Sequence, residues 1–216
     1  MKVGLLTLEG DIARLRSIRE AVGPGIGLLV DANHAYNAAT AVRMGRMMKE
    51  LGVLFFEEPV VPEDREGYRK VRAENPIAVA GGECEFTRYG FRDFIASGCV
   101  DIVQPDLAVC GGFTAFTQIL ALANSWGVST VPHVWGSGIA LAAALHAVAT
   151  IPAFPFTANA VPLVNQPVIE FDRKHNPLRD DLLHQRFELI DGCLAVPDAP
   201  GLGVTVRDDI LNQYAY

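Results

Sequence analysis

GLLVD at residues 27–31 opens a pattern that returns twice, as VLFFE at 53–57 and as IAVAGGE at 77–83. Each run is apolar and ends in an acid, and the acids Asp31, Glu57 and Glu83 are 26 residues apart. A strand, a crossover helix and the next parallel strand need about 25–30 residues, so the period predicts consecutive βα units. Ends of neighbouring parallel strands lie about 4.8 Å apart, which brings the three carboxylates together.

Carboxylates crowded in this way repel one another unless a cation lies between them. The pattern therefore predicts an oxygen-ligated metal site at the mouth of a parallel barrel. For any single acid, a helix N-cap or a solvated loop carboxylate is the alternative. The shared phase of the three favours the metal site.

Two further runs continue the period and end in reactive side chains. VDIVQPD (100–106) ends at Asp106 and VSTVPH (128–133) ends at His133, at intervals of 23 and 27 residues. Helical patterns fill the segments between the runs, at residues 11–22, 38–51, 62–74, 88–97, 113–126 and 138–150. Strands that are apolar throughout and alternate with helices predict a parallel sheet covered on both faces.

Composition indicates a cytoplasmic enzyme rather than a nucleic-acid or membrane protein. The chain has 216 residues, is 50% hydrophobic and carries a net charge of −7 without a basic run, which argues against nucleic acid and anionic membranes as partners. No apolar stretch reaches the roughly 18 residues of a membrane span. The four cysteines are scattered, as expected for thiols in a reducing compartment. Cys84 follows Glu83 and could line the site, but we expect a buried small hydrophobe.

Two basic residues are candidates for acid/base chemistry. Lys2 lies 29 residues before Asp31, about one βα period ahead of the first acid. A nearby divalent cation would lower the pKa of this lysine and so favour a proton acceptor. Asp106 and His133 fall on successive strands, where the acid would fix the imidazole tautomer and support a second acid/base. A structural role is the alternative for His133.

Six ordered motifs resemble the enolase superfamily, in its mandelate racemase/muconate lactonizing subgroup. They are Lys2-Val3-Gly4, Asp31-Ala32-Asn33, Glu57-Glu58-Pro59, Gly82-Glu83, Gln104-Pro105-Asp106 and Pro132-His133. The resemblance extends through Glu170-Phe171-Asp172 to the tail at 196–204. It implies a (β/α)7β barrel in which Asp31, Glu57 and Glu83 hold Mg²⁺, with Mn²⁺ as the alternative ion. It also implies Lys2 as the base, the Asp106–His133 dyad opposite, and Glu170 near the enolate oxygen.

Longer stretches, among them DANHAY (31–36) and EFDRKHNPLRDDLL (170–183), are similar to the acid-sugar members of that subgroup. This similarity implies a sugar acid or its lactone as substrate, with Asn33, His34 and Trp135 beside it. Core packing is the alternative for Trp135. Proton removal α to the carboxylate could then lead to cycloisomerisation, dehydration or racemisation, which the motifs do not separate.

The chain departs from the family at its start. Family members carry a capping domain and a first βα unit before the lysine strand, so we expect an incomplete barrel with about six strands and a stub. We expect one domain over residues 1–216, with 184–216 as a C-terminal tail, and a homo-oligomer. Two alternatives stay open: a Schiff-base aldolase, which would need a lysine on a central strand, and a catalytically impaired remnant or interaction module.

Overall fold

The computed structural model describes residues 1–152 and 167–214. Contacts divide the chain into two compact units. The first consists of Met1–Cys84 and Tyr89–Gln104, and the second of Glu85–Arg88 and Pro105–Tyr216. The single-domain organisation and the homo-oligomer expected from the sequence stay predictions.

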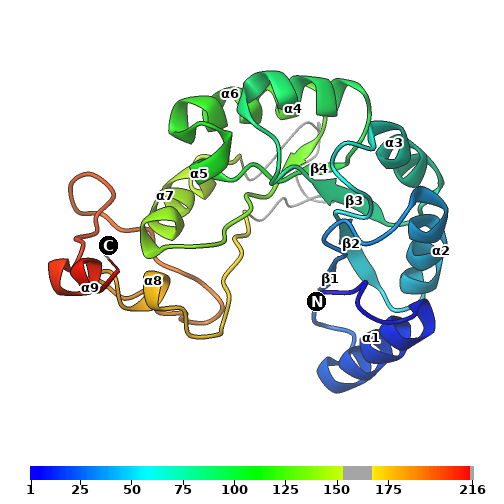
Figure 1. Ribbon diagram of the computed structural model, residues 1–216, viewed down its shortest axis with the longest axis horizontal. Coiled ribbons are helices and arrows are strands. Elements are labelled where there is room, and N and C mark those ends of the chain that lie inside the picture. The colour runs from blue at the N-terminus through cyan, green and yellow to red at the C-terminus, as the bar shows by residue number, and fades with distance from the viewer. Residues whose placement is uncertain (153–166, 215–216) are drawn as a thin grey trace. The chain divides into compact units, whose positions relative to one another are not determined.

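The first unit is built on parallel strands. They are β1 (Leu28–Asp31), β2 (Val53–Glu57), β3 (Ala78–Gly81) and β4 (Ile102–Val103), which pair in that order (Figure 1). Lys2 forms a parallel bridge with Asp31, so the expected strand stub at the start of the chain is present. This arrangement confirms the predicted parallel α/β class.

Four helices alternate with these strands, and side-chain caps set the starts of the first three. They are α1 (Leu8–Val22), α2 (Ala38–Lys49), α3 (Arg65–Glu74) and α4 (Thr87–Ala96). The N–H group of Gly67 donates to Asp64 Oδ1 at 2.8 Å, so Asp64 caps α3. Helix α3 therefore begins at Arg65, three residues later than the sequence pattern indicates. Asn37 caps α2 in the same way, accepting from Thr40 N at 2.9 Å.

The core of the first unit lies between these helices and the sheet. Figure 1 shows α1, α2 and α3 along one side of β1 to β3. Phe56 in β2 and Met44 in α2 are fully buried. Tyr68 in α3 packs edge-on against Phe94 in α4, with ring centroids 5.1 Å apart. Each such side chain stabilises the fold by about 1.5–3 kcal/mol through burial, which holds the strand ends in place.

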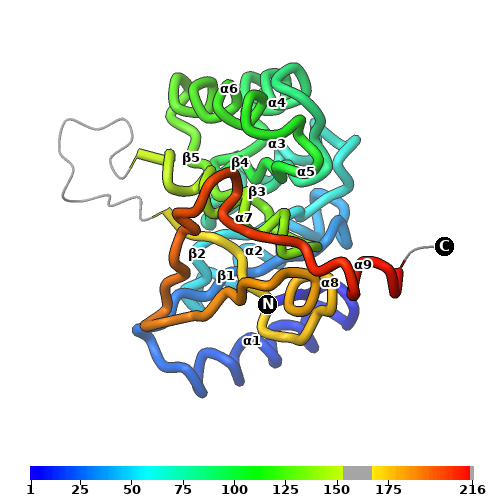
Figure 2. The backbone as a smooth tube through the Cα atoms, turned by 90° about the vertical axis from the view of Figure 1, so that its left-hand side faces the viewer, coloured from blue at the N-terminus to red at the C-terminus, as the bar shows by residue number. Residues whose placement is uncertain are grey.

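The regular elements of the second unit are mainly helices. It contains α5 (Leu107–Cys110), α6 (Gly112–Ser125), β5 (Ser129–Thr130), α7 (Gly138–Val148), α8 (Pro177–Asp180) and α9 (Asp208–Gln213). Figure 2 follows the C-terminal segment, in orange and red, from α8 to α9. In the described part of the chain, no helix combines the length and the apolar character needed to cross a membrane.

The runs at 100–106 and 128–133 were predicted as full strands, and that length is wrong. Each forms a strand of two residues. Pro105 and Pro132 follow within three residues, and proline has no N–H group for a sheet ladder. Asp106 instead caps the short helix α5, which the sequence pattern did not indicate.

Candidate active-site residues

Two of the predicted metal ligands lie side by side at the carboxyl end of the sheet. Asp31 ends β1, Glu57 ends β2, and the two residues are paired in register. Both are buried, with 7% and 5% of their surface exposed. Because the strands are parallel, the two side chains leave the sheet at the same edge.

Glu83, the third predicted ligand, follows β3 after a glycine turn. Gly82 has a φ of 128°, and a Cβ there would lie 3.0 Å from the ring of Phe91 and 3.3 Å from Gln104 N. Only glycine fits this turn without strain, so Gly82 sets the direction in which the chain presents Glu83. Glu83 itself is half-buried.

The Lys2 amine lies next to these acids. Its Nζ donates to Asp31 Oδ2, and Asp31 Oδ1 accepts from Asn33 N at 2.7 Å. Partial burial disfavours the charged amine, but the hydrogen bond and charge of Asp31, with Glu57 and Glu83, outweigh it and raise the pKa of Lys2. From the sequence, we expected a nearby divalent cation to lower the pKa of Lys2. Here the Lys2 ammonium itself balances the negative charge of the carboxylates, and its pKa is raised.

The chemistry of these three acids suits a hard divalent cation. Asp31, Glu57 and Glu83 all favour the charged form of the Lys2 amine, so each of the three carboxylates acts on the same positive group. Carboxylate oxygens are the ligands that Mg²⁺ prefers. The ligand assignment to Asp31, Glu57 and Glu83 stays a prediction.

His34, a predicted substrate contact, lies against a buried acid. His34 and Glu58 both have left-handed backbones, with φ of 65° and 43°. His34 Nε2 is 3.0 Å from Glu58 Oε2 and 3.8 Å from Cys84 Sγ. Cys84 is exposed, so its expected burial is wrong; the residue comes after the end of β3, beyond the packed part of the strand. Asn33 is exposed and also left-handed, with a φ of 42°.

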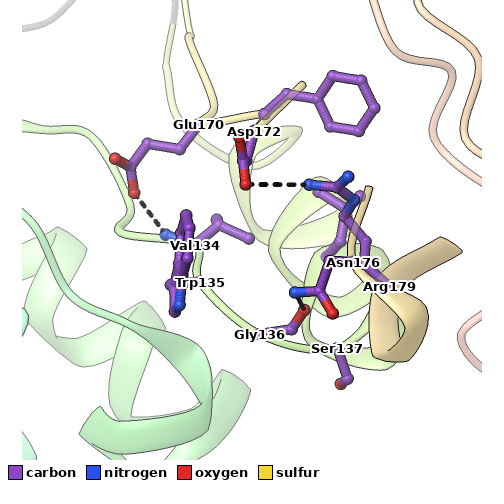
Figure 3. Close-up of a pocket in the computed structure, with 10 residues that line it drawn as sticks. Val134, Trp135, Gly136, Ser137, Glu170, Asp172, Asn176 and Arg179 are labelled. Carbon is purple, nitrogen blue, oxygen red and sulfur yellow. Dashed lines mark hydrogen bonds and ion pairs between the residues drawn. The ribbon is translucent and has the colours of Figure 1, made fainter. Parts of the chain in front are cut away.

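The second unit brings together the predicted histidine, its acid partner and Glu170. His133 Nδ1 is 2.7 Å from Asp106 Oδ2, and both side chains are largely buried. Glu170 Oε2 lies 3.9 Å from His133 Nε2 and accepts a hydrogen bond from Val134 N at 2.8 Å (Figure 3). A carboxylate bonded to Nδ1 leaves Nε2 as the nitrogen for proton transfer.

Trp135 lies beside Glu170 on a small pocket, which Figure 3 shows in close-up. Its surface is 63% exposed, so the core-packing alternative is wrong. Arg179 also lines this pocket and was not singled out from the sequence. It is held by two hydrogen bonds to Asp180, of 2.8 and 2.9 Å, which raise the pKa of Arg179. In the sequence, only its place in the charged segment RDD (179–181) could have drawn attention to Arg179.

Comparison with known proteins identifies the family of this chain and several similar enzymes. Residues 1–210 match the family described as enolase C-terminal domain-like. The D-galactarolactone cycloisomerase of Agrobacterium fabrum is 42% identical over 99% of this chain and 55% of its own length. The crystal structure of the 3,6-anhydro-D-galactonate cycloisomerase from Zobellia galactanivorans has 41% identity and a TM-score of 0.88, covering 99% of this chain and 57% of that one.

A third similar protein is an L-talarate dehydratase from Polaromonas sp. JS666, whose crystal structure is a complex with Mg and L-glucarate. It has 29% identity and a TM-score of 0.83, covering 98% of this chain and 53% of that one. The chain thus spans about half the length of the relatives it matches.

Proposed function

The chain belongs to the enolase C-terminal domain-like family, and from this premise we propose that it removes the proton α to the carboxylate of a sugar acid or its lactone. The observation that carries the proposal is the in-register pair Asp31 and Glu57 beside the Lys2 amine. The similarity to two cycloisomerases of sugar lactones or anhydro-sugar acids supports this substrate class. Cycloisomerisation is the favoured outcome, and the similarity to a dehydratase keeps dehydration as the second candidate.

The reaction needs charge stabilisation because an α-proton beside a carboxylate is very weakly acidic, and its loss leaves two negative charges. Mg²⁺, or Mn²⁺ in its place, would supply that stabilisation when bound by Asp31, Glu57 and Glu83. Burial of Asp31 and Glu57 keeps water from competing for their oxygens.

Lys2 is the proposed base of the first unit. The backbone bridge between Lys2 and Asp31 holds the lysine backbone at the carboxyl end of β1. The hydrogen bond from Nζ to the Asp31 carboxylate keeps the amine at the same end of the sheet. The neutral amine has one lone pair and can accept the α-proton. The ion pair with Asp31 must open for this, since only the deprotonated amine is a base.

His133 is the proposed acid/base of the second unit. Asp106 accepts a hydrogen bond from the Nδ1–H group of His133, fixes the tautomer and supports the imidazolium that forms when Nε2 takes a proton. Val134 N holds the Glu170 carboxylate 3.9 Å from that nitrogen. In its protonated form, Glu170 would donate a hydrogen bond to a substrate carboxylate oxygen, beside the protonated His133. Trp135 and Asn33 are the proposed substrate contacts, together with His34.

Exchange of the substrate α-proton with D₂O tests the proposal, because it requires only removal and return of the proton and none of the later steps of turnover. Aldonic acids, aldaric acids and their lactones are incubated with the chain and Mg²⁺ in D₂O, and deuterium at the α-carbon is followed by NMR. We expect exchange with a sugar acid that Lys2→Ala and Glu57→Gln both reduce by at least about 10²-fold. Glu20→Gln, at an exposed position in α1, is the matched control. Exchange of an aromatic 2-hydroxy acid with sugar acids inert would overturn the substrate class.

A further inference from the structure

A second group of potential metal ligands lies in the first unit, apart from the three predicted Mg²⁺ ligands. His34, Glu58 and Cys84 each offer one ligand atom, and these atoms lie within 4.8 Å of one another. His34 Nε2 is 3.0 Å from Glu58 Oε2 and 3.8 Å from Cys84 Sγ. Among the described residues this is the one group of three that comes so close together.

The spacing of the three atoms fits one ion bound between them. Zinc binds histidine nitrogen and carboxylate oxygen at about 2.0–2.2 Å and cysteine sulfur at about 2.3 Å. Tetrahedral angles then place neighbouring ligand atoms about 3.3–3.7 Å apart. Two of the three separations, 3.0 Å from His34 to Glu58 and 3.8 Å from His34 to Cys84, lie on either side of this range. The third, between Glu58 and Cys84, is within 4.8 Å. The site would therefore need small side-chain movements to reach tetrahedral geometry.

The donor set selects a different class of metal from Mg²⁺. Mg²⁺ takes oxygen ligands in near-ideal octahedral geometry, whereas one nitrogen, one oxygen and one sulfur suit a borderline-soft ion such as Zn²⁺. Three protein ligands leave a fourth tetrahedral position for water. Cys84 is exposed, which gives an ion a path from solvent.

The surrounding chain already orients two of the ligands. Val60 O lies 3.4 Å from His34 Nδ1 and can accept a hydrogen bond from an Nδ1–H group, which leaves Nε2 as the ligand nitrogen. His34 N donates to Glu58 O at 2.9 Å, so the backbones that carry the two side chains are tied together. Glu58 is 1% exposed, and a cation on its carboxylate would offset the cost of burying that charge.

We propose that His34, Glu58 and Cys84 bind a divalent transition metal of the zinc class, at a site separate from the Mg²⁺ ligands. On binding, a metal–sulfur bond forms at Cys84 and its S–H bond breaks, and the proton passes to the buffer. This proposal shares His34 with the proposed substrate contacts, but it does not depend on the proposed enzyme function, because it rests on the distances among His34, Glu58 and Cys84 and concerns a different ion.

Cobalt gives a direct readout, since Co²⁺ bound to a thiolate in tetrahedral geometry absorbs strongly in the near ultraviolet. The metal-free chain is titrated with Co²⁺ under reducing conditions and excess Mg²⁺, and Zn²⁺ is then added. We expect one equivalent of Co²⁺ with the thiolate band, and its displacement by Zn²⁺. Cys84→Ser should abolish the band and weaken binding by more than about tenfold.

Two control variants separate this site from other thiols and from the Mg²⁺ ligands. Cys193→Ser removes the other exposed cysteine and should leave the band intact. Glu57→Gln should also leave it intact. His34→Gln, at a half-buried position, checks the ligand set where Glu58→Gln fails to fold. A wild-type chain that binds no Co²⁺, a band that persists in Cys84→Ser, or full displacement of Co²⁺ by Mg²⁺ would each overturn the proposal.

Discussion

His133 Nδ1 lies 2.7 Å from Oδ2 of Asp106, and the other oxygen of Asp106 accepts the Ala108 N–H group at 2.7 Å. One carboxylate therefore both caps helix α5 and orients the imidazole. The cap fixes the carboxylate, so the histidine tautomer follows from the backbone of the helix start. This is why an acid at this position can act through His133 without touching a substrate.

Asp106→Asn should impair the reaction while the fold is kept. Asparagine caps helices as well as aspartate does, so α5 should persist. The amide carries no charge and can donate to Nδ1, which favours the wrong tautomer at Nε2. We expect α-proton transfer through His133 to fall by about 10²–10⁴-fold, with unchanged circular dichroism. The readout is the rate of turnover of the sugar acid that exchanges best.

The control for that experiment is Asp93→Asn, which removes an exposed carboxylate. Equal rates for Asp106→Asn and the control would contradict the dyad. A loss of helix signal in Asp106→Asn would show that the cap dominates its role.

Glu57→Gln should weaken Mg²⁺ binding by more than about tenfold, because a neutral amide oxygen replaces one of the three charged ligands. Calorimetric titration of the chain with Mg²⁺ measures this directly and should show a single site. Glu20→Gln changes the net charge by the same amount at an exposed position and should bind like wild type. If the two variants have the same affinity, Glu57 is not a ligand.

The parts of the fold that were predicted best from the sequence are those set by local patterns, such as apolar runs and helix caps. Strand ends at Asp31 and Glu57 follow from apolar runs with a fixed period, and both fall where expected. Helix α2 begins at Ala38, as predicted, because Asn37 is a strong cap. The lengths of strands β4 and β5 were overestimated, because a hydrophobic pattern takes no account of proline, which has no N–H group to donate to the sheet.

The contacts of the candidate site were harder to predict. The predicted strand ends at Asp31 and Glu57 put His34 and Glu58 just beyond them, but the pattern gave no sign that these two side chains meet, since left-handed backbone turns redirect both. The burial of Cys84 was misjudged for a similar reason: residue type gives an average tendency, and position beyond a strand end decides exposure. The roles of Lys2, His133 and the three acids stay predictions that the variants above test.

Gly82→Ala should destabilise the first unit and disturb Glu83. The substitution forces a side chain into a backbone with a φ of 128° and against Phe91 at 3.0 Å. We expect a loss of about 2–4 kcal/mol in the free energy of unfolding. Gly127→Ala is the matched control, since its φ is 66° with open space around the added Cβ. It should cost about 1 kcal/mol. Equal losses in urea denaturation would show that the contact with Phe91 is unimportant.

Native thiol labelling should divide the four cysteines into two pairs. Cys84 and Cys193 are exposed and should react with iodoacetamide, whereas Cys99 and Cys110 are buried. Burial, and then the charge of Asp106, raise the pKa of Cys110 to about 11, which further slows its reaction. Peptide mass spectrometry before and after unfolding in urea measures all four. Rapid native labelling of Cys99 or Cys110 would contradict the packing around them.

Tyr36→Phe should protect the protein at alkaline pH. Burial, followed by the charge of Asp11, raises the pKa of Tyr36 from 10.0 to about 12. Between these values the unfolded chain loses the phenol proton and the folded chain keeps it, so stability falls as pH rises from about 10 towards 12. Phenylalanine has no phenol proton to lose, so the variant lacks this contribution to the loss of stability. The Tyr36 hydroxyl has no hydrogen-bond partner among the described residues, so the substitution should cost little at neutral pH.

Urea denaturation at several pH values measures the effect. The decline above pH 10 should be shallower in Tyr36→Phe than in wild type, while Tyr89→Phe, at an exposed site, should follow wild type. Tyr68, whose pKa is raised well above its usual value by burial and then by Glu58, contributes a decline of the same sign that remains in both variants. A Tyr36→Phe curve that coincides with wild type at every pH would show that Tyr36 ionises in the folded protein as easily as in the unfolded chain.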